Sequence, residues 1–207
     1  MYATVHDLRF ESVEVERASD ERLTTLLLEA SGLIDRVTGS FFEPRAVELR
    51  LSGRDAPSIY PPHPPVALTE LWVWDEQLDL DIVEVVGAPV MSWSDGPRIT
   101  RRHGVFSRGN GNVRAIGTWG DVERDVAGAW QTPLPIRRAA MLLALRWVGP
   151  LADETERRAP WRVVAEATRD QSVRYSDGGV GERPLTSDPE VDALLWPFVR
   201  RSQIGAA

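Results

Sequence analysis

The sequence predicts an α+β fold, in which a small helical bundle carries an inserted antiparallel β unit and ends in an extended C-terminal tail. Three observations predict it. Apolar residues recur at helical spacing near the N-terminus, they do so again after residue 132, and between these stretches they alternate as in strands. We expect N-terminal helices over 1–44, the β unit over 45–120, a second bundle helix with a mixed region over 121–187, and the tail over 188–207.

The N-terminal region predicts two helices. The spacing of Thr4 and Asp7 is typical of a capping box, which predicts a short leading helix. Ser19 is a favourable N-cap for a long helix that we expect to end at Gly39. The long helix carries one apolar stripe, formed by Leu23, Leu26, Leu27, Ala30, Ile34 and Val37.

The middle region predicts strands. In "AVELRLSG" the apolar residues Val47, Leu49 and Leu51 alternate with polar ones. The four prolines of "SIYPPHPP" predict an extended link, because proline fixes φ and lacks a backbone donor. Further strands are expected in "VALTELWVW", "LDLDIVEVV", "PRITRR" and "NVRAIGTW", with "RGNGN" as a hairpin turn. Trp72 and Trp74, two residues apart, are expected to face the same side of one strand.

A second bundle helix is predicted from Thr132, with Pro133 in its first turn. Its apolar stripe is wide, so we expect contacts on more than one side. The stripe comprises Ile136, Ala140, Leu143 and Trp147, widened by Ala139, Leu142 and Leu145. Beyond residue 150 the sequence predicts a helix broken at Pro160, then a strand "SVRY", a loop, and a short final helix with Ser187 and Glu190 as a capping box.

Composition excludes several classes of protein. The chain has 207 residues and no cysteine, so it has no disulfides and no thiolate ligands. The net charge is −7, and every basic residue is arginine. The N-terminal stretch lacks the apolar region of a signal peptide, and no apolar run is long enough to span a bilayer. We therefore expect a protein that is made in the cytoplasm and does not enter a membrane.

The sequence also lacks recognisable catalytic motifs. Zinc-protease, nucleophile-elbow and P-loop patterns are missing. The three histidines, His6, His63 and His103, fall in different predicted elements and are interpreted as surface residues. The sequence therefore predicts no catalytic residues, no metal site, no cofactor and no enzymatic activity.

Two sets of like charges stand out in the β unit. The acidic set is Asp75, Glu76, Asp79, Asp81 and Glu84, and the basic set is Arg98, Arg101, Arg102, Arg108 and Arg114. Alternation along the chain places Asp79 and Asp81 on a solvent face. The acidic set could alternatively bind a divalent cation, as in a metal-dependent hydrolase, and the basic set could contact nucleic acid, as in a DNA-binding module. A further interpretation is that the two sets meet, either within one sheet or between neighbouring copies. We prefer contacts between copies, since head-to-tail contacts close into rings.

The C-terminal segment is rich in large apolar residues that have little remaining chain to cover them. Tryptophan is enriched among interface hot spots, which favours an interface role for this segment. The candidate contact residues are Leu194, Leu195, Trp196, Phe198 and Ile204.

The order of these elements resembles the head–tail connector (adaptor) proteins of tailed phages, in particular longer members with an inserted β unit. The likeness covers most of residues 1–148 and the final twenty. It rests on four stretches: the long helix ending in Thr38-Gly39, the Pro-rich "IYPPHPPVALTELWVWDE", the pair "NVRAIGTWGDV" and "TPLPIRRAAMLLALRWV", and the C-terminal "DPEVDALLWPFVRR".

The resemblance implies a structural virion protein of the phage neck. Such proteins form a ring of twelve copies between the portal and the tail, with a channel through which genomic DNA passes as non-specific cargo. It further implies that residues 188–207 dock on the portal protein, and that stopper, tail-completion or tail-tube proteins bind the opposite side. A stopper or tail-completion protein, one layer further from the capsid, is the closest alternative.

Overall fold

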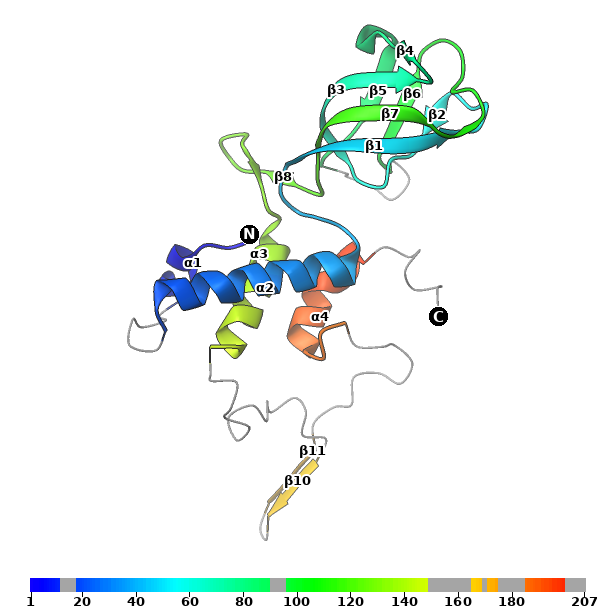
Figure 1. Ribbon diagram of the computed structural model, residues 1–207. Coiled ribbons are helices and arrows are strands. Elements are labelled where there is room, and N and C mark those ends of the chain that lie inside the picture. The colour runs from blue at the N-terminus through cyan, green and yellow to red at the C-terminus, as the bar shows by residue number, and fades with distance from the viewer. Residues whose placement is uncertain (12–17, 90–95, 149–164, 169–170, 175–184, 200–207) are drawn as a thin grey trace. The chain divides into compact units, whose positions relative to one another are not determined.

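The computed structural model describes residues 1–11, 18–89, 96–148, 165–168, 171–174 and 185–199 (Figure 1). The chain forms two compact units. A helical unit combines residues 1–39 with 134–207, and a β unit comprises residues 40–133. The β unit is thus inserted between two helices of the helical unit, and the predicted α+β class is confirmed.

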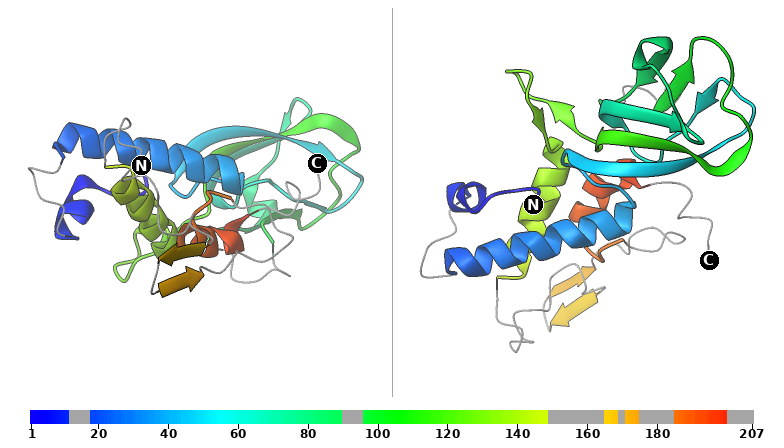
Figure 2. Two further views of the ribbon diagram at one scale, coloured as in Figure 1. Left: turned by 90° about the horizontal axis from the view of Figure 1, so that it is seen from below. Right: turned by 45° about the horizontal axis from the view of Figure 1, so that its top comes forward.

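The helical unit is built on a central helix that contacts three others. Its helices are α1 (Val5–Phe10), α2 (Asp20–Thr38), α3 (Leu134–Arg146) and α4 (Pro189–Leu195), and α4 continues into the 3-10 turn η4 (Trp196–Phe198). α3 crosses α2 and packs against α1 and α4 as well (Figures 1 and 2). The wide apolar stripe of α3 is therefore covered from more than one side, as predicted.

Local signals set the ends of the first two helices. The Thr4–Asp7 capping box is present at α1. The Ser19 hydroxyl accepts a hydrogen bond from the backbone N–H of Arg22, and α2 ends where Gly39 adopts a φ of 68°. The apolar stripe of α2 is buried as expected except for Val37, which is half-buried. The fully buried side chains of the unit include Leu8, Leu23, Leu26, Leu27, Ile34, Ile136 and Leu195.

The β unit consists of two antiparallel sheets and a hairpin. A four-stranded sheet has the order β1-β7-β3-β4, from β1 (Arg45–Gly53), β7 (Gly109–Trp119), β3 (Pro65–Val73) and β4 (Glu76–Gln77). A three-stranded sheet has the order β2-β6-β5, from β2 (Ser58–Ile59), β6 (Arg98–Arg101) and β5 (Val83–Val86). β8 (Glu123–Arg124) and β9 (Trp130–Gln131) form a hairpin that projects from the sheets (Figure 2).

One apolar core joins the two sheets of the β unit. Leu71, Val113 and Ala115 from the larger sheet pack with Ile99 and Val83 from the smaller one. Val47, Leu49 and Leu51 of β1 pack against this core, which confirms the predicted alternation. The fully buried Trp119 closes the core, and its indole N–H donates to the carbonyl oxygen of Val47 at 3.0 Å.

Two predictions for the β unit are wrong, the first because of long-range pairing and the second because of a local side-chain cap. The "RGNGN" stretch is not a hairpin turn, since β7 already begins at Gly109. Its Asn112 side chain accepts a hydrogen bond from the Gly53 N–H at 2.9 Å, and Gly111 donates to the Ser52 hydroxyl. The stretch 78–86 is not one strand either. Asp79 accepts from the Asp81 N–H and starts the 3-10 turn η1 (Leu80–Ile82) before β5.

Trp72 and Trp74 do not share a strand face. β3 ends at Val73, and Trp74 occupies the following turn with a φ of 56°. The alternation rule applies only inside a strand, so the hairpin turn takes Trp74 out of the pattern.

Two predictions for the helical unit also need correction. The N-cap of α4 is Asp188 rather than Ser187, because the Asp188 carboxylate accepts from the N–H groups of Glu190 and Val191. In the region expected to be helical around Pro160, residues Ala165–Thr168 form strand β10, which pairs with β11 (Gln171–Arg174). The predicted "SVRY" strand is confirmed over its first three residues, and Pro160 lies outside the described residues.

Candidate interaction surfaces

The start of α4 is fixed to α3 by charged groups. The Arg146 guanidinium of α3 forms an ion pair with the Asp188 carboxylate, whose side chain is only 5% exposed. Arg146 also contacts the Glu190 carboxylate at 3.0 Å, and Arg138 lies 3.5 Å from Glu190. The Asp192 carboxylate accepts from the N–H groups of Leu185 and Thr186. The segment 185–198 is therefore part of the helical unit rather than an extended tail.

The five predicted contact residues of the C-terminal segment differ in how far this packing buries them. Leu195 is fully buried, so the expectation that it serves as an exposed anchor is wrong: its side chain fills the helical core. Leu194 and Phe198 are half-buried, and Trp196 is exposed. Ile204 lies outside the described residues. Trp196 is thus the large apolar side chain that this segment presents to solvent, at 39% exposure.

The acidic set of the β unit is exposed throughout. Asp75 lies in the β3–β4 turn, Glu76 begins β4, and Asp79 and Asp81 flank the start of η1. Glu84 lies on β5, directly opposite Thr100 of β6. The predicted solvent exposure of Asp79 and Asp81 is confirmed, although they are not in a strand.

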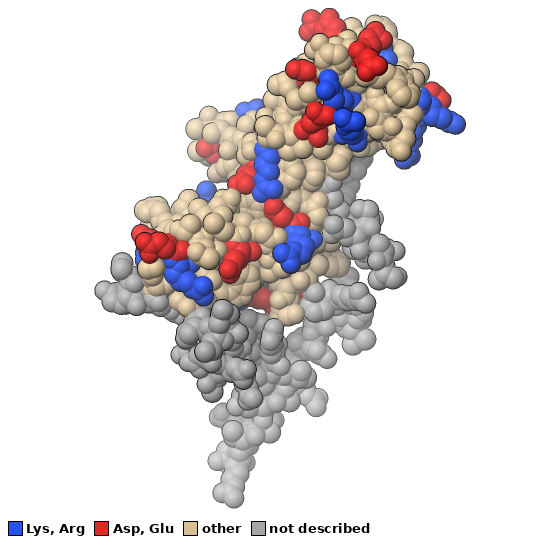
Figure 3. Space-filling model, in the orientation of Figure 1, with Lys and Arg blue, Asp and Glu red and all other residues tan. Residues whose placement is uncertain are grey.

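The basic set is partly engaged inside its own unit. Arg101 donates to the Val105 carbonyl at 2.8 Å, Arg108 pairs with Asp55 at 3.4 Å, and the Arg114 guanidinium stacks on the Trp72 ring at 4.8 Å. Arg98 is half-buried and Arg102 is exposed. Acidic and basic side chains both occur on the face of the β unit seen in Figure 3.

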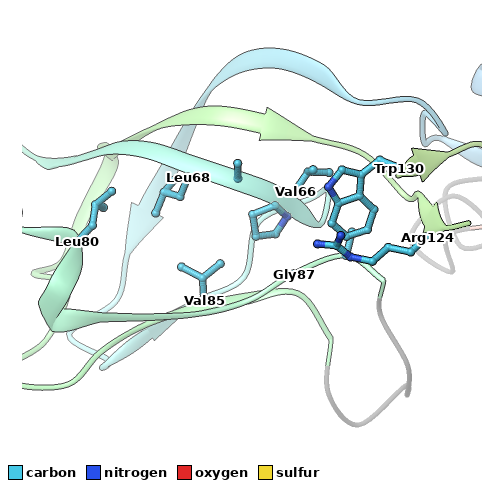
Figure 4. A pocket seen from close by; sticks show the side chains of 10 residues that line it. Val66, Leu68, Leu80, Val85, Gly87, Arg124 and Trp130 are labelled. Atoms are coloured by element: carbon cyan, nitrogen blue, oxygen red, sulfur yellow. The ribbon is translucent and has the colours of Figure 1, made fainter. Parts of the chain in front are cut away.

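A pocket of about 320 Å³ opens between β3 and the η1–β5 segment (Figure 4). Leu68 of β3 faces Leu80 and Val85 across it, and the β8–β9 hairpin closes one end with Arg124 and Trp130. The Arg124 guanidinium lies 4.0 Å from the centre of the Trp130 ring and donates to the Gly128 carbonyl at 2.7 Å. The pocket is thus lined by apolar side chains together with a similar share of polar atoms, and one oriented cation lies at its end.

Sequence reasoning missed this pocket. Its walls come from segments that are far apart along the chain, from Pro65 at the start of β3 to Trp130 in β9. The one local signal is the pair Arg124 and Trp130, which flank a Gly-containing turn and face each other across a two-stranded hairpin.

Within the described residues, no group of three or more His, Asp or Glu side chains is placed to hold a metal ion. His6 lies in α1, His63 stacks on Phe41 at 4.2 Å between ring centres, and His103 is exposed. None of the described helices has the length and apolar character needed to cross a membrane.

No protein-family model and no curated protein matches the sequence. Two solved structures are similar in fold. One is described as the neck of a native GTA (gene transfer agent) particle with C12 symmetry. It shares 16% identity over 94% of this chain and 87% of that chain, with a TM-score of 0.54. The other is described as the neck of an empty GTA particle with C6 symmetry, at 17% identity over 88% and 79% of the two chains and a TM-score of 0.51.

At these identities the similarity is one of fold. Because it extends over nearly the whole of both chains, it includes the helical unit and the inserted β unit alike. The protein is therefore an α+β chain with a β unit inserted into a helical bundle. It shares this fold with a chain from the neck of a phage-like particle.

Proposed function

We propose that this chain is a structural protein of the neck of a phage-like particle, and that twelve copies form the head–tail connector (adaptor) ring. The observation that carries the proposal is the fold match over 94% of the chain to a chain in a particle neck with C12 symmetry. The C12 symmetry belongs to that particle and supports a twelve-fold ring here. The role is non-enzymatic, and the ring surrounds a channel for the genome.

The charge of the protein suits a channel for DNA. At −7 per chain, a ring of identical copies is strongly acidic, and a polyanion passes an acidic wall without being retained. DNA is then cargo and not a ligand. The ring is assembled in the host cytoplasm and stays in the virion between capsid and tail.

The proposed ring has three kinds of contact. The C-terminal segment docks on the portal protein, with Trp196 as the exposed anchor. Stopper or tail-tube proteins bind the opposite side. Neighbouring copies meet through charged residues of the β unit, and Arg102 is an exposed member of the basic set that can be tested. Replacing Arg102 with Glu is expected to weaken the ring. Unchanged assembly would show that Arg102 takes no part in the contact between copies.

The order of assembly distinguishes a connector from a stopper. Sedimentation velocity of the purified protein, alone and mixed with the portal protein of the same genome, tests the proposal. A connector forms a large complex with the portal protein directly. A stopper binds only after a separate connector has been added. That result would show that this chain is a stopper protein and not the connector.

A further inference from the structure

The pocket between β3 and β5 is open although apolar side chains line both of its walls. Val85, on its wall, is 40% exposed. On the other wall, β3 pairs with β4 only at Trp72 and Val73. The pocket therefore offers a slot between apolar side chains, with polar atoms in its lining, beside a strand edge, and such a slot can bind an amphipathic side chain from outside.

Arg124 gives this slot a charge preference. Its contacts are the Gly128 carbonyl and the face of Trp130, and within the described residues it has no carboxylate partner. These two contacts hold the guanidinium at the mouth of the pocket. An acidic group that follows an apolar side chain into the slot would therefore meet a fixed cation.

The β3–β4 turn complements this pocket, because it carries an exposed indole next to two carboxylates. Trp74 is 62% exposed and has a φ of 56°, at a turn position that usually takes Gly, Asn or Asp. Asp75 and Glu76 follow it, are exposed, and have no ion pair within the described residues. A strained, exposed tryptophan next to two carboxylates is typical of a contact site rather than of a core.

We propose that the Trp74–Asp75–Glu76 turn of one copy docks in the β3–β5 pocket of the next copy, with the indole between Leu68 and Val85 and the carboxylates at Arg124. This inference rests on the proposed ring of identical copies. A pocket of about 320 Å³ lies at the small end of the range for ligand sites and suits one indole. The turn acts as an anchor inside a larger subunit contact.

The turn cannot enter the pocket of its own chain. Trp74 lies six residues beyond Leu68 along the same strand and its turn, which is roughly 20 Å at the rise of a β-strand. Its indole also lies against Gly109, because a Cβ placed there would come within 2.8 Å of the Trp74 ring. The contact is therefore heterologous, joining one surface to a different surface of the neighbour, which is the geometry that closes into a ring.

Cross-linking between copies tests this contact, and the chain contains no cysteine that would interfere. We would mix two single variants, Asp75→Cys and Val85→Cys, assemble them with the portal protein, and add a short bis-maleimide. A covalent dimer that requires both variants is expected. Tyr60→Cys replaces Val85→Cys in the control, because Tyr60 is an exposed residue of the same unit at 71% exposure and does not line the pocket.

A charge swap provides the second readout. Arg124→Glu and the pair Asp75→Arg, Glu76→Arg are each expected to reduce the ring-containing fraction at least tenfold, and their combination is expected to restore it. Arg54→Glu, an exposed arginine of the same unit, is the matched control and should leave assembly unchanged.

The outcomes distinguish a failure of the docking contact from a failure of the proposed connector role. Rings that form without a cross-link between the Asp75→Cys and Val85→Cys copies, or a charge swap that does not restore assembly, would overturn the docking contact and leave the connector role standing. If the wild-type chain forms no ring with or without the portal protein, the proposed function and this contact both fail.

Discussion

The Arg146 guanidinium on α3 is ion-paired with the Asp188 carboxylate, which also caps the first turn of α4. Asp188 thus links the last helix to the bundle in two ways, through its charge and through the N–H groups of Glu190 and Val191. The segment expected to dock on the portal is consequently held in a fixed position.

Replacing Asp188 with Ala is expected to lower the free energy of unfolding of the helical unit by about 3 kcal/mol. The change removes an N-cap and leaves the charge of Arg146 without its main partner. Urea unfolding followed by helical circular dichroism measures it. Glu190→Gln is the control, because that carboxylate is half-exposed and its pairs are worth less than about 1 kcal/mol. Equal stability of the two variants would contradict this role of Asp188.

Because of the α1 capping box, the contribution of Asp7 to the stability of the fold is expected to depend on pH. Burial raises the pKa of the Asp7 carboxyl, but hydrogen bonds from the Thr4 N–H and hydroxyl and the charge of Arg137 lower it, and the net pKa lies below the ordinary 3.8. A lowered pKa in the folded state means that Asp7 stabilises the fold above about pH 4, and that this contribution is lost as the pH falls through the folded pKa.

The expected result is that Asp7→Asn destabilises the helical unit at pH 6 and that the difference from wild type shrinks towards pH 3. Urea unfolding at several pH values measures it, with Glu29→Gln on the exposed face of α2 as the carboxylate control. A stability difference that does not change with pH would show that the Asp7 charge is not involved.

Substitutions of Trp74 are expected to affect the stability of the fold and the assembly of copies differently. At a φ of 56°, alanine is strained and glycine is not, so Trp74→Gly should be more stable than Trp74→Ala by about 1 kcal/mol. Thermal unfolding measures the difference. Both variants are expected to lose assembly, because both lack the indole. If Trp74→Gly assembles like wild type, the indole is not an anchor.

Leu195 and Trp196 are neighbours with opposite expected effects. Leu195→Ala should cost about 3 kcal/mol of stability because the side chain is fully buried. Trp196→Ala should cost less stability than Leu195→Ala, because Trp196 is 39% exposed, and should weaken portal binding by about 2 kcal/mol, or roughly 30-fold in Kd. Sedimentation titration against the portal protein measures the second effect, and unaltered binding would exclude Trp196 from the interface.

The sequence predicted the parts of the fold that depend on local chemistry. The limits of α2 follow from the Ser19 cap and from the left-handed Gly39, and the strand β1 follows from the alternation of Val47, Leu49 and Leu51. Both kinds of signal lie within a few residues of the structure that they determine.

Features that depend on distant partners could not be predicted. "RGNGN" has the composition of a turn and becomes a strand because β1 is available to pair with it. Asp188 displaces Ser187 as the cap because Arg146, far away along the chain, provides its counter-charge. The pocket near Arg124 forms only when β3, β5 and the β8–β9 hairpin have assembled.

Native mass spectrometry of the protein mixed with its portal, with negative-stain imaging of the same sample, is the most direct test for a ring of identical copies on the portal. We expect a complex whose mass exceeds that of the portal assembly by twelve chains of 23.1 kDa, seen as a ring stacked on the portal. A folded 23.1 kDa monomer beside an unmodified portal assembly would contradict it.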